Sequence, residues 1–204
     1  MTPVRAFFVS AATIDGPTSR TVRVSVSDGE LSTIDTATVD VTNVDPTATF
    51  NSPASVFAGF PIALSLTNAT DAAPADRPGL TYAFDCGSGY GAFSASSTAS
   101  CPTDDVGTRS VGGMVRDDDG GETEYRATVA VVVTFDSLCA LVRVYVDSQD
   151  VADSLCEKLD AAEAKKARTG VTDLSSFVHQ VEAQSGKSMT ATEAATLIRL
   201  AGAL

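Results

Sequence analysis

The sequence contains no tryptophan, one histidine and only 6% aromatic residues in 204 positions. A lone histidine without a neighbouring cysteine cannot supply the nitrogen and sulfur ligands of a zinc site. A serine hydrolase that used that residue, His179, would need Ser175 or Ser176 as its nucleophile, and neither lies in a G-x-S-x-G elbow. We therefore predict no catalytic residues, no bound cofactor and no enzymatic activity.

Long apolar runs are also missing. No segment reaches the ~18 uninterrupted apolar residues of a membrane-spanning helix. The stretch 1–15 is too weakly apolar for a secretory signal peptide, and we expect such a signal to lie upstream of Met1. The even number of cysteines in a turn-rich β chain favours an oxidising compartment, and hence an extracellular or cell-surface location.

Basic residues are scarce. The formal net charge is −12, and residues 1–134 contain seven arginines, no lysine and sixteen acidic residues. A surface of this sign repels phosphate backbones, which excludes nucleic acid as a partner. It suits solubility and the binding of divalent cations.

The four cysteines form two near-neighbour pairs with no C-x-x-C spacing, which favours disulfides over metal ligation. Cys86 and Cys101 flank a loop of low apolar content, so we predict that they are bonded. Cys139 and Cys156 lie on either side of a predicted helix–helix turn at similar heights, and we predict a second bridge there. The alternative for this second pair is two buried free thiols.

What the chain does contain is a repeat of 89 to 90 residues. Residues 20–22 recur as 109–111 and residues 26–28 as 115–117, both at an offset of 89. Residues 37–39 recur as 127–129 at an offset of 90, so one residue is inserted between them. A repeat of this length is too long for a solenoid unit and has the size of a small β-sandwich domain.

Alternating patterns predict strands in both copies. Residues 47–134 form a complete copy, whereas residues 1–46 match only its second half and are joined to it by a linker ending at Pro46. Half a sandwich cannot cover its own apolar face, so we expect 1–46 to lack its early strands or to pair with a partner. The predicted strands are 21–27, 36–42, 47–50, 61–66, 80–85, 108–116 and 124–134, with Gly112-Gly113 indicating a bulge or a close backbone approach.

Residues 135–204 change to a 3.6-residue period and predict four short amphipathic helices in a small bundle. Gly170 and Gly186 are placed as helix stops, and Thr190 with Glu193 forms a capping box. The predicted fold class is therefore multidomain β plus α: an immunoglobulin-like β-sandwich followed by a four-helix bundle. The four apolar stripes are Leu138/Val142/Tyr145, Val151/Leu155/Leu159, Leu174/Phe177/Val178/Val181 and Ala194/Leu197/Ile198/Ala201.

Two segments of the β part resemble the PKD (polycystic-kidney-disease-type) domain. Residues 80–89 (LTYAFDCGSG) are similar to the family's Y-x-W-D-F-G-D-G strand and turn, with Phe84 in place of the tryptophan. Residues 115–120 (VRDDDG) are similar to its V-x-D-x-D-G hairpin, and residues 26–29 are a shortened version. The resemblance implies a β-sandwich that serves as an extracellular spacer, an adhesion module or a carbohydrate-binding accessory.

The segments 137–141, 154–159 and 196–200 resemble the FIMAH domain, a helical module of secreted bacterial proteins. This second resemblance implies a C-terminal location in a larger protein rather than an activity.

Oxygen ligands near a glycine turn suit hard cations. Asp117, Asp118 and Asp119 are therefore a weak calcium candidate, although the EF-hand pattern fails because Val115 and Arg126 occupy ligand positions. The alternative is an acidic hairpin turn.

We expect a non-catalytic extracellular or cell-surface spacer or adhesion module, part of a larger secreted bacterial protein, that binds an unknown protein or polysaccharide surface. One alternative is an accessory glycan- or calcium-binding region of a secreted hydrolase whose catalytic domain lies elsewhere. A second is a cytosolic interaction protein with reduced cysteines.

Overall fold

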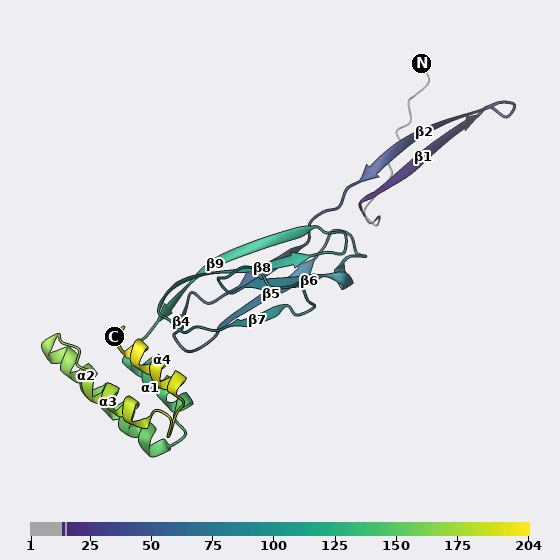
Figure 1. Ribbon diagram of the computed structural model, residues 1–204. Coiled ribbons are helices and arrows are strands. Elements are labelled where there is room, and N and C mark those ends of the chain that lie inside the picture. Colours follow the sequence, from purple (N-terminus) through teal and green to yellow (C-terminus); the bar gives the residue numbers. More distant parts are fainter. Residues whose placement is uncertain (1–13, 15) are drawn as a thin grey trace.

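The structure is a computed structural model that describes residues 14 and 16–204. Three parts follow one another along a rod (Figure 1): a two-stranded hairpin, a β-sandwich and a group of four helices. The stretch 1–15, which the sequence analysis found too weakly apolar for a signal peptide, lies almost entirely outside the described residues. None of the described helices is both long and apolar enough to cross a membrane.

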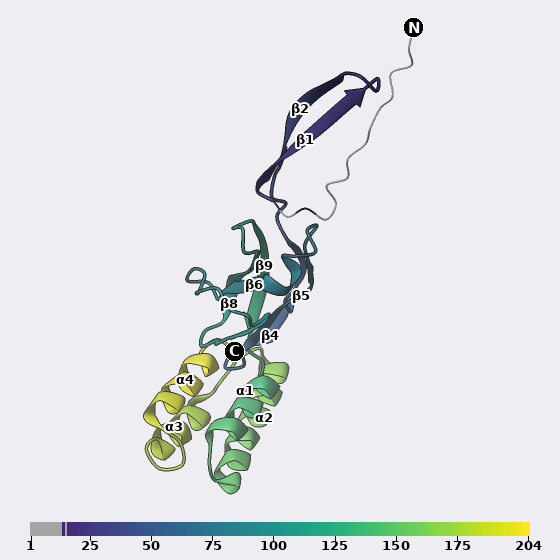
Figure 2. The ribbon, with the colours of Figure 1, turned by 90° about the vertical axis from the view of Figure 1, so that its right-hand side faces the viewer.

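The hairpin consists of β1 (Thr18–Ser27) and β2 (Ser32–Val41), which pair with each other only. Valine alternation along β1 produces the strand, and the Asp28-Gly29 turn closes it, with Gly29 at a φ of 100°. None of the twenty residues in these two strands is buried. Figure 2 shows the hairpin standing clear of the sandwich.

The sandwich packs a three-stranded sheet, in the order β3-β5-β7, on a four-stranded sheet in the order β4-β9-β8-β6. All neighbouring strands are antiparallel except β4 and β9. The prediction of an immunoglobulin-like sandwich is confirmed, and two short strands, β4 and β7, were missed. The seven strands are β3 (Thr47–Asn51), β4 (Ser55–Phe57), β5 (Ile62–Thr70), β6 (Thr81–Asp85), β7 (Thr98–Cys101), β8 (Gly107–Arg116) and β9 (Glu122–Val132).

The two glycines in β8 mark a close approach and not a bulge, because the β8–β9 register runs unbroken. A Cβ on Gly113 would lie 2.8 Å from Cδ2 of Phe50, and one on Gly112 would collide with the Tyr90 hydroxyl. Glycine therefore lets the ring of Phe50 reach the sheet.

The four predicted helices are present, and α2 is longer than expected. Their bounds are α1 (Phe135–Tyr145), α2 (Gln149–Thr169), α3 (Ser175–Gln184) and α4 (Ala191–Ala201). Helix α1 packs on α2 and α4, and α3 packs on the same two helices. Gly170 ends α2 with a φ of 72°, and the Thr190–Glu193 capping box begins α4.

Both predicted disulfides are formed. Cys86–Cys101 joins the start of the loop after β6 to the end of β7, with Cα atoms 5.4 Å apart. Cys139–Cys156 joins α1 to α2, with Cα atoms 5.1 Å apart. Each of the two packed parts thus has one covalent cross-link, and the hairpin has none among the described residues.

The helices and the sandwich share one apolar cluster. At their contact, a Cβ on Gly59 would lie 2.6 Å from Cδ2 of Leu141, so glycine is needed for the approach. The guanidinium of Arg199 also pairs with Asp105, with 3.0 Å between Nε and Oδ1.

Candidate metal centre at the junction of the β units

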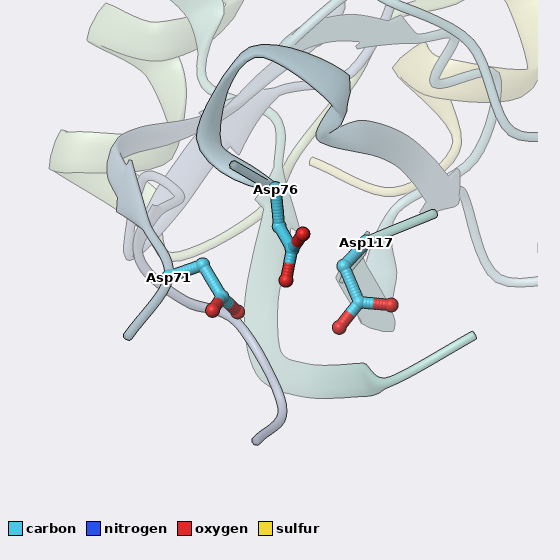
Figure 3. Close-up of side chains that lie close together, drawn as sticks. All are labelled: Asp71, Asp76 and Asp117. Atoms are coloured by element: carbon cyan, nitrogen blue, oxygen red, sulfur yellow. The ribbon is translucent and has the colours of Figure 1, made fainter. Parts of the chain in front are cut away.

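Three aspartates gather where the hairpin's linker meets the sandwich. Asp71 directly follows β5, Asp117 directly follows β8, and Asp76 precedes the short 3₁₀ turn η1 (Arg77–Gly79). One carboxylate oxygen from each lies within 4.8 Å of the other two. Figure 3 shows the three carboxylates pointing toward a common centre.

All three side chains are buried, with exposed fractions of 4% for Asp71, 0% for Asp76 and 3% for Asp117. Among residues 14 and 16–204, no basic side chain forms an ion pair with Asp71 or Asp117. Two ionised carboxylates 4.8 Å apart repel each other by roughly 3 kcal/mol at an effective dielectric constant of 20. Buried charges in proteins are normally paired or coordinate a metal.

The decisive atom is Oδ2 of Asp71. It is inaccessible to solvent and has no hydrogen-bond partner, whereas Oδ1 of the same residue accepts the N–H of Ala73 at 2.7 Å. The Nε of Arg77 donates to the backbone carbonyl of Asp71 at 2.8 Å and leaves the carboxylate untouched. An unpartnered buried carboxylate oxygen close to two further carboxylates is the arrangement that a cation ligand requires.

The linker between the two β units contributes to the same place. The Nδ2 of Asn43 donates to Oδ2 of Asp117 at 2.8 Å. Around Gly121, the position of an added Cβ would be 2.5 Å from Oδ2 of Asp117, 2.7 Å from Nδ2 of Asn43 and 2.9 Å from Oδ1 of Asp45. The exposed Asp45 therefore lies next to Asp117, outside the group of three buried aspartates.

This donor set fits Ca²⁺. The ion takes six to eight oxygen ligands from carboxylates, carbonyls and water, in flexible geometry. The three buried aspartates offer carboxylate oxygens of the kind that Ca²⁺ takes. No nitrogen or sulfur ligand of the kind preferred by Zn²⁺ belongs to the described cluster.

The acidic run found in the sequence is divided by the fold. Asp117 enters the cluster, whereas Asp118 and Asp119 are exposed outside it. Asp71 and Asp76 were missed because each is isolated in a segment read only as a turn. The position of Asp71 just beyond a strand end is the one signal that could have found it, whereas Asp76 precedes the 3₁₀ turn and has none.

A fourth buried aspartate, Asp85, has a structural role. Its Oδ1 accepts the N–H groups of Gly87 at 2.7 Å and Gly89 at 2.8 Å, and its Oδ2 lies 3.1 Å from NH1 of Arg126. Burial opposes ionisation, but the backbone N–H groups and Arg126 outweigh it and lower the pKa of Asp85. The satisfied carboxylate holds the Gly87–Gly89 turn and leaves no ligand atom free.

The remaining residues considered for chemistry do not assemble. His179 is exposed on α3. The hydroxyl of Ser175 donates to Asp173 at 2.8 Å and not to the imidazole. The structure therefore brings no serine–histidine pair together in this helix.

Comparison with known proteins shows likeness at the level of solved structures only. No family model matches the chain, and no curated protein matches it. A structure from work on the promiscuous specificity of carbohydrate-binding modules of the β-sandwich superfamily aligns with a TM-score of 0.39 and 25% identity. That alignment covers 45% of this chain and 36% of the other.

Two further structures are similar to parts of the chain. The PKD1 domain of Vibrio anguillarum Epp aligns with a TM-score of 0.34 and 25% identity, over 45% of this chain and 99% of that domain. Fibronectin(III)-like modules of Clostridium thermocellum CbhA align with a TM-score of 0.38 and 16% identity, over 57% of this chain and 64% of theirs.

Proposed function

We propose that this chain is a non-catalytic extracellular or cell-surface spacer or adhesion segment whose inter-unit junction binds one Ca²⁺. The observation that carries the proposal is the buried, unpartnered Oδ2 of Asp71 facing Asp76 and Asp117. The two disulfides support an oxidising compartment, where calcium is plentiful.

The linear arrangement supports the spacer role. The hairpin, the sandwich and the helices follow one another along the rod with the junction between the first two (Figure 1). Because Asn43 and Asp45 come from the linker, a cation bound at Asp117 ties the hairpin's linker to the sandwich. In this proposal, the ends of the segment attach to a protein or polysaccharide surface. The helices have the role of a FIMAH-like domain.

The expected affinity is modest. Calcium sites of extracellular modules have dissociation constants of about 10⁻⁴ to 10⁻³ M. At about ten times the dissociation constant, calcium stabilises the folded state by ~1.4 kcal/mol, which raises the melting temperature of a small domain by several degrees.

Calorimetric calcium titration and thermal unfolding of the full chain test the site with two variants. Asp71→Asn keeps an oxygen for the Ala73 N–H and removes one buried charge, so we expect it to abolish the calcium-induced shift and to raise stability without calcium. Asp118→Asn makes the same charge change on an exposed residue of the next loop and is the matched control. The proposal is contradicted if calcium binding survives Asp71→Asn but is lost in Asp118→Asn. That result would place the calcium site in the hairpin turn instead.

A further inference from the structure

The hairpin β1–β2 is a register-matched copy of β8–β9. Val22 pairs with Ala37 and Val111 with Ala127, and the ends also match, since Ser27 pairs with Ser32 as Arg116 pairs with Glu122. The offset is 89 residues along the first strand and 90 along the second, throughout. Equivalent residues therefore lie on equivalent faces.

The environments of these faces are opposite. Val111, Val115 and Val129 are 0% exposed beneath the β3-β5-β7 sheet. Of their counterparts in the hairpin, Val26 is 66% and Val39 is 45% exposed, and Val22 is half-buried. An aliphatic face of this regularity is the inner face of a sandwich without its second sheet.

The area of the hairpin face indicates whether a separate protein or a part of the same polypeptide covers it. Two ten-residue strands, at about 3.4 Å per residue and 4.8 Å between strands, present roughly 300 Å². A stable interface between separate proteins buries about 800 Å² on each partner. A separate protein would bind this face weakly, whereas a sheet in the same polypeptide is held at high effective concentration.

Two substitutions within the repeat show that the cover is not the chain's own three-stranded sheet from a second copy. Val24 stands where Gly113 admits the Phe50 ring, and a Cβ there lies 2.8 Å from Cδ2 of that ring. Asp35 replaces Tyr125, whose ring stacks with Phe50 and whose hydroxyl accepts the N–H of Ala48. A sheet that covers the hairpin must therefore place a side chain smaller than phenylalanine over Val24 and a hydrogen-bond donor near Asp35.

We propose that the Val22–Val26 and Ala37–Val41 face is covered by a β-sheet carried on the same polypeptide, N-terminal to Thr18. In the second unit, the covering strands β3, β5 and β7 all precede β8 in the chain, within 47–101. The same order along the chain places the covering sheet of the first unit before β1. This inference is independent of calcium binding.

Hydrogen exchange and intact mass of the polypeptide isolated from its natural host test the proposal. We expect a chain longer than 204 residues in which the amides of β1 and β2 are protected to within about tenfold of those in β8 and β9. A host polypeptide that begins at Met1, or a longer one whose hairpin amides exchange freely, would overturn it. So would hairpin protection that appears only on dimerisation of the 204-residue chain.

A matched pair of variants in the host-length polypeptide sharpens the result. Val24→Asp alters the proposed inner face, and Ile34→Asp alters the opposite face at a residue of similar exposure, 43% against 48%. We expect Val24→Asp to accelerate hairpin exchange at least about tenfold and Ile34→Asp to change it less than about twofold. Equal effects of the two substitutions would contradict a covered face, and the β8–β9 amides report whether each variant is folded.

Discussion

The hairpins β1–β2 and β8–β9 share strand length and register, yet one lies uncovered and the other forms the centre of a packed domain. Strand length and register do not explain the difference, because the two hairpins share both. It lies in what is opposite: β3 and β5 place Phe50, Leu64 and Leu66 over the second hairpin. Pairing register is thus a local property, whereas burial depends on a second sheet.

The comparison extends to their aspartates. Asp28 and Asp117 directly follow the first strand of each hairpin. Asp28 is exposed and caps its own turn by accepting the N–H groups of Glu30 and Leu31, which lower its pKa. Asp117 is buried beside Asp71 and Asp76. A turn aspartate becomes a candidate ligand only when a preceding unit and a neighbouring loop bring further carboxylates to it.

The largest expected difference follows from placing a charge on equivalent positions. Val115→Asp buries an unpaired carboxylate and should lower the free energy of unfolding of the sandwich by about 4 kcal/mol. Val26→Asp in the same 204-residue chain should change it by no more than about 0.5 kcal/mol. Denaturant unfolding followed by far-ultraviolet circular dichroism measures both, and similar losses would mean that the hairpin face is already covered.

The cross-links offer the next comparison. Removing Cys139–Cys156, which closes a 17-residue separation, with serines at both positions should destabilise the helices by about 3 kcal/mol. The β-sheet transition should remain at its parental denaturant concentration. The control is the double serine variant of Cys86 and Cys101, which should move the β transition instead. A C139S/C156S variant that unfolds like the parent would show that the staple contributes nothing.

Exchanging Gly113 and Val24, the residues that distinguish the two hairpin faces, should change the free energy of unfolding by a smaller amount. Gly113→Val forces the Phe50 ring to move, and overpacking of this kind costs about 1–3 kcal/mol. Val24→Gly removes a side chain that is 43% exposed and should cost about 0.5–1 kcal/mol through strand propensity. Thermal unfolding of the two variants checks the order, and a stabilising Gly113→Val would contradict the packing at Phe50.

The smallest effect concerns pH. The pKa of Asp85 is lowered in the folded state, so its contribution is fully present above the unfolded pKa of about 3.9 and is lost as the pH falls through the folded value. Asp85→Asn should therefore cost about 1 kcal/mol at neutral pH and nothing once the parental Asp85 is protonated. A stability gap that persists in strong acid would assign the effect to packing instead.

Much of the fold follows from short-range patterns. The valine alternation of 21–27, the capping box at Thr190 and the glycine after α2 each predict an element that the structure contains. The strands β4 and β7 were missed because three or four residues with half-exposed side chains carry no period. Both cysteine pairs were predictable because their spacing across a loop or a helical turn limits which sulfur atoms can meet.

The candidate site was predicted only in part. The contiguous run Asp117–Asp119 drew attention to the correct loop, but neighbouring residues at a strand end point in different directions and only Asp117 is buried. Asp71 lies 46 positions earlier in the chain and meets Asp117 because β5 and β8 belong to facing sheets. A contact of this kind depends on sheet packing, which no local pattern reports.

The central claim, that a cation ties the linker to the sandwich, is tested most directly by backbone hydrogen exchange with and without millimolar calcium. We predict that the amides of 43–45 and 118–121 slow by about tenfold with calcium, while those of β8 keep their rates. The Asp71→Asn chain should show no change. If the exchange rates at 43–45 in the parent chain are the same with and without calcium, a bound cation does not tie the linker to the sandwich.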